Sequence, residues 1–210
     1  MEKGFQVAFE AAWQAYVSGT IPIGACVLNE EDEVVAIGKN QIHCEADNKN
    51  LIAMHQLAHA EANALLQFSE EETPNRHPDI RKYTLYAVME PCPFCFGAIV
   101  MGSIRNVKFA ARDGIAGAMA LNSSLEYIKS KNIRVEGPFI NLEILQLAIQ
   151  SCYELEYCSN PKRLIENWRT YCPMGISIGE RMHKDGILRQ FTNEGKPFEA
   201  VEEYITKYIS

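Results

Sequence analysis

The sequence lacks an excess of basic residues. Its 210 residues contain 20 lysines and arginines against 27 aspartates and glutamates, which gives a net charge of −7. Proteins that bind the phosphate backbone of nucleic acids usually carry a basic balance or a basic patch. The charge therefore argues against nucleic acid as the main partner, although a local basic face would remain compatible with it.

A long apolar run is also missing. The best apolar stretch, residues 94–101, is much shorter than the roughly 20 residues that a membrane-spanning helix needs. Glutamate, lysine and glutamine interrupt any signal-peptide core within the first 14 residues. The sequence contains neither an internal repeat nor a low-complexity tract. We therefore expect no association with membranes.

The cysteines do not form the pattern of a disulfide framework. There are seven of them, an odd number, in a chain that is not short. We expect a reducing cytoplasm, where a C-x-x-C spacing more often binds a metal or takes part in catalysis than forms a structural disulfide. The apolar fraction of 47% is ordinary for a soluble globular protein.

Hydrophobic periodicity predicts an α/β architecture. The predicted helices cover residues 2–18, 58–68, 92–102, 119–129 and 141–155. The predicted strands cover residues 23–29, 33–38, 83–89, 105–111 and 133–135. Strands that alternate with helices favour a sheet with helices on both faces. Gly24, near the start of the first strand, either lets a ligand approach the backbone or makes a close packing contact.

The character of the sequence changes near residue 158. We predict a first domain over residues 1–157 and a mainly helical extension over residues 158–210 that packs on it. The extension carries eight basic and seven acidic residues, so it is nearly neutral. Helices are expected at 162–171 and 197–208. An irregular segment is expected between them, where the helical pattern is interrupted by Pro173, Gly175, Gly179 and Gly186.

Three residues with the chemistry of metal ligands stand near the starts of two predicted helices: His59, Cys92 and Cys95. Three protein ligands leave the fourth position of a tetrahedral zinc open to water, whereas structural zinc sites are closed by four ligands. Glu61 follows His59 by two positions, where it is placed to move protons. Together the four residues match the H-x-E…P-C-x-x-C pattern of zinc nucleobase deaminases.

Two other interpretations of this motif explain less. A structural zinc would need a fourth cysteine or histidine at finger-like spacing, and a redox C-x-x-C would leave His59 and Glu61 without a role. We expect Glu61 to act first as a base toward water and then as an acid toward the leaving amine. Backbone groups are the candidates to hold the new oxygen and the amine: the N–H groups of Ala60 and Cys92, and the carbonyls of Glu90 or Pro91.

With these residues in view, the sequence resembles the cytidine/deoxycytidylate deaminase superfamily, and most of all its branch of tRNA adenosine deaminases and bacterial guanine deaminases. The resemblance covers roughly residues 3–157. Besides the zinc motif, it rests on the segments Pro22-Ile23-Gly24-Ala25, Gly38-Lys39-Asn40, Leu57-Ala58-His59-Ala60-Glu61, Thr84-Leu85-Tyr86, Glu90-Pro91-Cys92, Gly97-Ala98-Ile99, Ala111-Arg112-Asp113 and Arg134-Val135-Glu136.

The resemblance implies a three-layer α/β/α cytidine-deaminase-like fold with a five-stranded mixed sheet. It also implies one Zn²⁺ per subunit and a homodimer or larger assembly. Asn40 falls where the family places an asparagine that contacts the base, and Asp113 falls where this branch has a contact on the ribose or substrate side. These roles are expectations from the resemblance alone.

Our first hypothesis is a small-molecule enzyme that hydrolytically deaminates a free nucleobase or nucleoside, either a purine or an aminopyrimidine. The aromatic residues Trp168, Phe191 and Tyr204 of the extension then either stack on the base or pack in the core. The alternative is a tRNA wobble-adenosine deaminase. The segment from Asn40 to the H-A-E motif is longer than in the tRNA enzymes, and the extension lacks their basic character, so both features favour the first hypothesis.

A non-catalytic subunit is a third possibility. Such proteins commonly lose the glutamate of the motif, and Glu61 is present in this sequence. The sequence therefore favours an enzyme.

Overall fold

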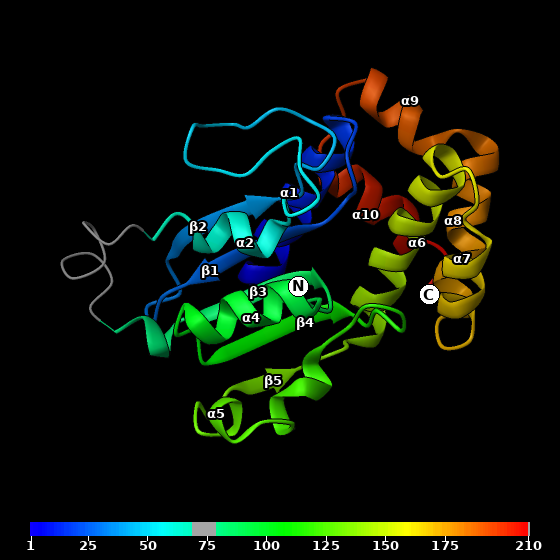
Figure 1. Cartoon of the computed structure of the whole chain (residues 1–210). Helices are drawn as coiled ribbons and strands as arrows, with labels where there is room; N and C mark the ends of the chain where they lie inside the picture. The colour runs from blue at the N-terminus through cyan, green and yellow to red at the C-terminus, as the bar shows by residue number, and fades with distance from the viewer. Residues whose placement is uncertain (69–78, 210) are drawn as a thin grey trace.

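The computed structural model describes residues 1–68 and 79–209, and within them the chain forms a five-stranded mixed sheet with helices on both sides (Figure 1). This architecture confirms the predicted fold class. The order of the strands across the sheet is β2-β1-β3-β4-β5. The strands are β1 (Gly24–Leu28), β2 (Val34–Lys39), β3 (Thr84–Met89), β4 (Asn106–Ala111) and β5 (Arg134–Glu136).

The pairing of the strands determines which loops meet. β1 pairs antiparallel with both β2 and β3, whereas β3, β4 and β5 run parallel to one another. The carboxyl ends of β3 and β4 therefore lie at the same edge of the sheet. In open α/β sheets, ligands bind in the crevice outside the carboxyl ends of the strands.

Two pairs of helices cover the two faces of the sheet (Figure 1). α1 (Lys3–Val17) and α6 (Ile140–Tyr157) lie on one face, and α2 (Ala60–Leu65) and α4 (Pro93–Met101) lie on the other. Side chains of β1 alternate between the two cores, because successive residues of a strand point to opposite faces. Cys26 and Leu28 pack with α1 and α6, and Ala25 and Val27 pack with α2 and α4.

Shorter helices complete the sheet domain. They are η1 (Ile80–Lys82), η2 (Met119–Ser123) and α5 (Glu126–Lys129), so the helix predicted over 119–129 forms as two short pieces. The polar composition of residues 69–82 predicts a loop; residues 69–78 lie outside the described residues, and η1 lies within the rest of that range. Among the residues that the structure describes, no helix has both the length and the apolar character that crossing a membrane requires.

Two glycines in the strands, Gly24 of β1 and Gly38 of β2, allow two helices to pack closely on the sheet. A side chain at Gly24 would collide with the carbonyl oxygen of Ala8 in α1, which explains this glycine as a packing contact. A side chain at Gly38 in β2 would collide in the same way with the carbonyl oxygen of Ala60 in α2. Both helices therefore lie directly on the backbone of the strands, and the start of α2 is held against the end of β2.

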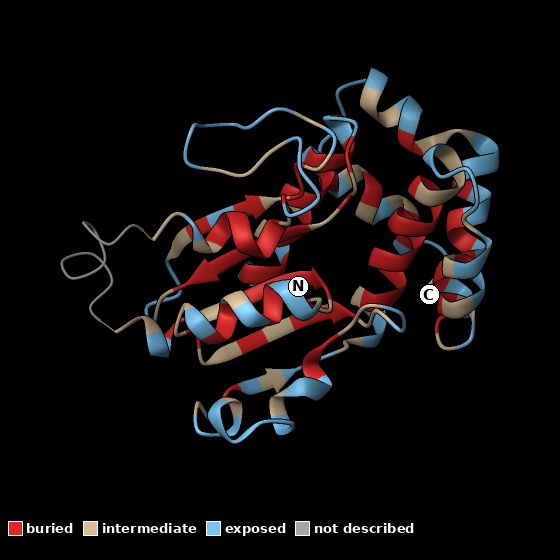
Figure 2. Ribbon diagram, in the orientation of Figure 1, coloured by how far each residue is buried: buried red, intermediate tan, exposed pale blue. Residues whose placement is uncertain are grey.

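The C-terminal helices pack on the sheet domain through a shared core (Figure 2). They are α7 (Lys162–Arg169), α8 (Pro173–Asp185), α9 (Ile187–Asn193) and α10 (Phe198–Thr206). Phe198 of α10 stacks on Phe9 of α1 with 5.3 Å between the ring centroids. The division of the chain at residue 157 stays a prediction, although the core itself runs without interruption from α1 and α6 into α8 and α10.

The segment predicted to be irregular after Pro173 is helical, and that prediction was wrong. Pro173 occupies the first turn of α8, where a proline costs no hydrogen bond. Gly175 and Gly179 are buried on the side of α8 that faces α6, and side chains there would meet the backbone of α6 and Ser151. The glycines therefore permit close contact between two helices, a purpose that their local sequence does not reveal. Gly186 ends the helix in the left-handed conformation.

This contact predicts opposite effects for the same substitution in two helices. Gly179→Ala places a methyl group against Ser151 and within 2.6 Å of the carbonyl oxygen of Ala148. We expect it to lower the free energy of unfolding by about 1–3 kcal/mol, because overpacking outweighs the better helix propensity of alanine. Gly97→Ala in α4 is the control, since its methyl group meets nothing within 4 Å, and it should raise stability by up to about 1 kcal/mol. Urea denaturation of both variants checks the prediction, and equal signs would contradict it.

Candidate metal centre

A cavity of about 130 Å³ lies at the carboxyl ends of β3 and β4 and brings together most of the predicted site residues. The backbone N–H of Glu90 donates to the carbonyl of Ala111 at 2.7 Å, which ties together the two strand ends. The end of β2 reaches the same place, since Asn40 N–H donates to the carbonyl of Ile23. The cavity is lined by Ile21, Ile23, Asn40, Ile42, His59, Ala60, Glu61, Met89, Glu90, Cys92, Asp113 and Ala116.

Two helix starts bring the predicted metal ligands together. His59 and Cys92 are the residues immediately before α2 and α4, and both have extended backbone conformations, while Cys95 lies in the first turn of α4. His59 is therefore not inside the helix, which begins one residue later than the ligand. The Nδ1 atom of His59 lies 3.5 Å from Sγ of Cys92 and 3.4 Å from Sγ of Cys95.

The spacing of these atoms fits a tetrahedral zinc ion. Zinc–sulfur bonds of about 2.3 Å and zinc–nitrogen bonds of about 2.0–2.1 Å place nitrogen and sulfur ligands about 3.6 Å apart in a tetrahedron. The three ligand atoms all lie within 4.8 Å of one another. No other group of His, Cys, Asp or Glu in the described residues meets this criterion. One imidazole and two thiols are the donor set of a zinc site with a free fourth position.

The charges of the ligand cluster favour a thiolate at Cys92. Hydrogen bonding from Cys95 and from His59 lowers the pKa of the Cys92 thiol to about 4. The same hydrogen bond to Cys92, together with burial, raises the pKa of Cys95. The hydrogen bond to Cys92 also raises the pKa of His59. The cluster thus concentrates negative charge on sulfur, which a divalent cation would neutralise.

Glu61 lies in the cavity wall with little contact to solvent. Glu61 is 4% exposed, and burial raises the pKa of its carboxyl group. A carboxyl group whose pKa moves toward neutrality can both accept and release a proton under physiological conditions. Glu61 therefore lines the cavity beside the ligand cluster and has the chemistry that proton transfer needs.

Asn40 presents only one half of its amide to the cavity. Its Oδ1 accepts hydrogen bonds from the hydroxyl of Thr20 at 2.8 Å and from the N–H of Ile42 at 3.0 Å. Within the described residues, no acceptor is hydrogen-bonded to its Nδ2 group. Because Asn40 is 2% exposed and lines the cavity, a ligand there can satisfy the amide only by accepting a hydrogen bond.

Of the four residues whose backbone groups were predicted to contact a substrate, Ala60, Glu90 and Cys92 line the cavity and Pro91 does not. In the described part of the chain, the N–H groups of Ala60 and Cys92 make no backbone hydrogen bond, as expected at helix starts. The Pro91 carbonyl already accepts the N–H of Ala118 at 3.0 Å. The Glu90 side chain accepts the N–H groups of Asp113 and Met119 at 3.2 and 3.1 Å. Glu90 therefore holds a neighbouring loop in place, a role that its sequence position did not suggest.

Asp113 faces the cavity but uses part of its carboxylate locally. Its Oδ1 accepts the N–H groups of Ile115 and Ala116 at 2.9 and 3.1 Å, which shapes the loop that follows β4. The apolar lining by Ile21, Ile42 and Met89 was not predicted. These side chains are ordinary apolar residues in the sequence, and only the fold brings them to one wall.

The aromatic residues of the extension do not reach this cavity. Trp168 is buried in the core, and Phe191 and Tyr204 pack against that core with their rings 6.1 Å apart. None of the three lines the cavity. Of the two interpretations, core packing is the one that the structure supports.

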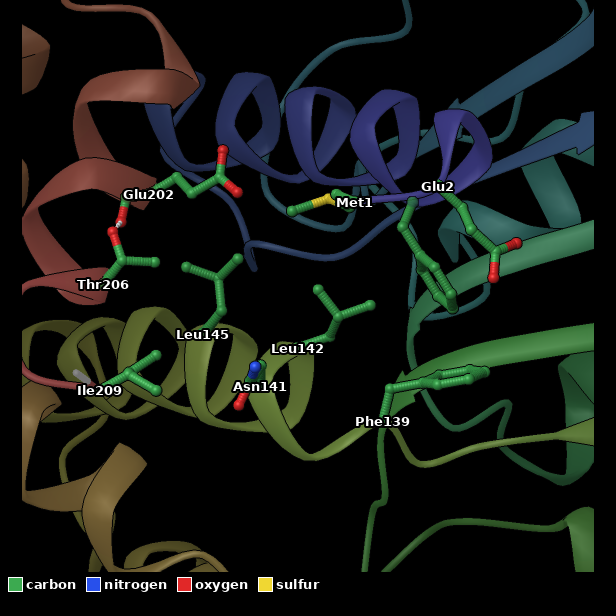
Figure 3. Close-up of a pocket in the computed structure, with 10 residues that line it drawn as sticks. Met1, Glu2, Phe139, Asn141, Leu142, Leu145, Glu202, Thr206 and Ile209 are labelled. Atoms are coloured by element: carbon green, nitrogen blue, oxygen red, sulfur yellow. Dashed lines mark hydrogen bonds between the residues drawn. The ribbon is translucent and has the colours of Figure 1, made fainter.

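A second cavity, of about 380 Å³, contains none of the predicted site residues (Figure 3). It lies between α1, α6 and α10, and its walls include Phe139, Leu142, Leu145 and Ile209. Its titratable lining residues are the carboxylates of Glu2 and Glu202. The chemistry for metal binding is thus concentrated at the smaller cavity.

Comparison with known proteins agrees with this geometry. Residues 1–111 match the family described as "Cytidine and deoxycytidylate deaminase zinc-binding region". The chain is 26% identical to a cytosine deaminase of Candida albicans over 157 residues, which cover 73% of this chain and 85% of the relative. It is 30% identical to a tRNA-specific adenosine deaminase of Haemophilus influenzae over 118 residues, which cover 56% of this chain and 62% of the relative.

A solved structure shows the same fold. The guanine deaminase from Nitrosomonas europaea superposes with a TM-score of 0.52 over 72% of this chain and 83% of that chain, at 18% sequence identity. The zinc cofactor expected from the motif fits both the family and the placement of His59, Cys92 and Cys95. Because the match to the family covers more than half of the residues of this chain, the chain belongs to the cytidine and deoxycytidylate deaminase family.

Proposed function

We propose that the protein is a zinc-dependent hydrolytic deaminase that removes the exocyclic amine of a free nucleobase or nucleoside and releases ammonia. The observation that carries the proposal is a cluster of three zinc-type ligands, two of which, His59 and Cys92, line one small cavity together with the buried Glu61. Membership of the deaminase family supports hydrolysis of a C–N bond.

The residues divide the chemistry among them. Zinc, when bound by His59, Cys92 and Cys95, supplies a water that is acidic enough to react at neutral pH. Glu61 would take one proton from the attacking water and deliver it to a ring nitrogen of the substrate, as the water oxygen bonds to the ring carbon that carries the amine. It would then move the remaining hydroxyl proton from that carbon to the amino group. The C–N bond breaks, ammonia leaves, and the oxygen stays on the ring carbon as a carbonyl. One carboxyl group whose pKa is raised by burial suits both steps.

Asn40 selects the orientation of the ring. Its free Nδ2 group donates, and its occupied Oδ1 cannot readily accept another hydrogen bond. A substrate bound in the reactive orientation therefore presents a carbonyl oxygen or an unprotonated ring nitrogen to Asn40. The backbone N–H groups of Ala60 and Cys92 would hold the new oxygen, and the carbonyls of Glu90 or Pro91 would hold the leaving amine. Asp113 also lines the cavity and would supply a further contact to the substrate.

The lining of the cavity favours a small uncharged substrate. Isoleucines and Met89 offer apolar surface for a heterocyclic ring, and the described lining residues include no lysine, arginine, phenylalanine, tyrosine or tryptophan. Two carboxylates, Glu90 and Asp113, face the cavity and would repel a phosphate. A free base or nucleoside fits this lining better than a nucleotide.

A tRNA adenosine deaminase is the second candidate. Identity of 30% and 33% to tRNA-specific adenosine deaminases of Haemophilus influenzae and Bacillus subtilis favours it. The net charge of −7 and the lack of cations at the described cavity lining count against it, since phosphate contacts provide most of the affinity for nucleic acid.

Two further properties belong to the proposal. A homodimer is expected from the family resemblance, and exposed apolar side chains on α4, among them Phe94 and Met101, are compatible with such an interface. Cytoplasmic localisation is expected because the seven cysteines are free thiols.

An ammonia-release assay tests the proposed function. Zinc-loaded protein is incubated with a panel of free bases, nucleosides, nucleotides and an anticodon stem-loop. We expect the highest kcat/KM for an unphosphorylated base or nucleoside. A preference for the stem-loop, with steeply salt-dependent binding, would favour the tRNA candidate, and no ammonia from any compound would refute both.

A further inference from the structure

A loop that lines the site cavity is held both by residues that follow β3 and by the C-terminal extension, residues 158–210. Asp113 and Ala116 line the cavity, and they belong to residues 112–118, which we call the site loop. From the inner side, the Glu90 carboxylate accepts the N–H groups of Asp113 and Met119, and the Pro91 carbonyl accepts that of Ala118. These bonds anchor the start and the end of the site loop to the segment between β3 and Cys92.

The outer side of the site loop is held by Tyr171, which follows α7. Its hydroxyl group donates to the carbonyl of Arg112 at 3.1 Å and accepts the N–H of Gly114 at 3.1 Å. These two residues flank Asp113 directly. The hydroxyl therefore bridges the backbone on both sides of the residue that faces the cavity.

A second set of contacts fixes Tyr171 to Arg112. The guanidinium carbon of Arg112 lies 4.7 Å from the centroid of the Tyr171 ring. Nε of Arg112 donates to the carboxylate of Glu143 in α6 at 2.8 Å, and the side chain of Glu143 is 5% exposed. The backbone N–H of Arg112 donates to the same carboxylate at 3.2 Å. The arginine is thus held between the ring and a buried carboxylate, and its carbonyl is directed to the tyrosine hydroxyl.

The fit between the extension and the site loop leaves no spare room. A methyl group at Gly114 would collide with Oδ1 of Asn167 and lie 3.0 Å from the Tyr171 ring. Oδ1 of Asn167 is buried and has no hydrogen-bond partner in the described residues, so it contacts Gly114 by van der Waals packing and not by a hydrogen bond. α7 and Tyr171 therefore lie directly against the backbone beside Asp113.

We propose that Tyr171 is a positioning residue through which the C-terminal extension fixes the site loop and sets the affinity for substrate. The inference rests on the proposed function for its catalytic consequence, but not for its structural one. Tyr171 does not line the cavity, so it acts through Asp113 and Ala116 rather than by contact with the ring. The metal ligands and Glu61 belong to α2, α4 and the residues just before them, outside the reach of its hydroxyl bonds.

Tyr171→Phe tests this proposal, because it keeps the ring over Arg112 and removes only the bridging hydroxyl. The substitution removes two hydrogen bonds, and we expect KM to rise by at least about 2- to 12-fold, the range that corresponds to loss of one of them, while kcat and zinc content stay unchanged. Hydrogen–deuterium exchange should be faster in peptides that cover residues 112–119. Tyr208→Phe is the matched control, since its hydroxyl donates to the hydroxyl of Tyr204 and its ring contacts Arg181, both within the same extension. It should change neither KM nor the exchange rate of residues 112–119.

The exchange measurement separates this inference from the proposed function, because it needs no substrate. Wild-type-like exchange of residues 112–119 in the Tyr171→Phe variant would overturn the inference, whatever the enzyme assay shows. Faster exchange with an unchanged KM would also overturn it, since the loop would then not control substrate binding. Absence of ammonia release by the wild-type protein would refute the proposed function instead.

A pair of size-changing variants gives an independent test. Gly114→Ala should raise KM and the exchange rate of the site loop, because its methyl group pushes Asn167 away. Adding Asn167→Ala makes room for the methyl group and should restore both quantities toward their wild-type values. An unchanged KM in Gly114→Ala, or no recovery in the double variant, would contradict the close fit that the proposal requires.

Discussion

Glu61→Gln is expected to lower kcat by about 10²- to 10⁴-fold while the protein keeps one zinc per subunit. Glutamine has nearly the same shape and retains a hydrogen-bonding oxygen, but it cannot take a proton from water or return one to the amine. The residue is 4% exposed, so bulk water has little access to replace it. Ammonia release at saturating substrate and metal analysis of the same sample measure the two quantities.

Glu31→Gln is the matched control for this variant. It makes the same change of charge in the exposed turn between β1 and β2, far from the cavity lining, and should retain full activity. If zinc-loaded Glu61→Gln released ammonia at the parent rate, another group would have to transfer the protons. If instead it lost zinc, the carboxylate would belong to the ligand set.

Cys95→Ala is expected to weaken zinc binding by more than about 100-fold. Mutation of residues that only hydrogen-bond to a metal ligand already costs up to about 100-fold in affinity, and loss of a ligand itself should cost more. Cys95 is fully buried, and its sulfur lies 3.4 Å from Nδ1 of His59, so no water can readily replace it as a ligand. Activity should fall with the zinc content. Thermal stability should fall too, because a metal that binds only the folded state stabilises it.

Cys152→Ala separates loss of a ligand from loss of buried volume. Cys152 of α6 is 1% exposed in the core and takes no part in the ligand cluster. The same truncation there should reduce stability without changing zinc stoichiometry or kcat. Titration of both proteins with zinc against a chelating indicator gives the affinities. Equal zinc affinity of Cys95→Ala and wild type would remove Cys95 from the proposed ligands.

The metal centre could be predicted because its signals are local in sequence. His59 and Glu61 stand together at one helix start, and Cys92 and Cys95 stand together at another. Each pair has a spacing that can be recognised within one segment of the sequence. A strand that precedes each of the two helices would bring both pairs to the same edge of a sheet. The structure brings the three ligand atoms together as that spacing predicted.

Contacts between distant segments could not be predicted in this way. The Oδ1 atom of Asn40 is occupied by Thr20, and nothing in either residue announces that pair. Gly179 interrupts a helical pattern when it is read alone, yet it is required where α8 meets α6. Tyr171 looked like one more aromatic residue of the extension, and its link to the site loop depends on how α7 packs.

The order of residues along the chain was sufficient to predict a zinc-type ligand set, a carboxylate proposed for proton transfer and the alternation of helices and strands. These features depend on spacing, and spacing is a property of one segment at a time. Tertiary structure alone decided which half of the Asn40 amide is free, which side chains wall the cavity and what holds the loop of Asp113. Those depend on partners 20 to 59 residues away, whose positions follow from packing of the whole core.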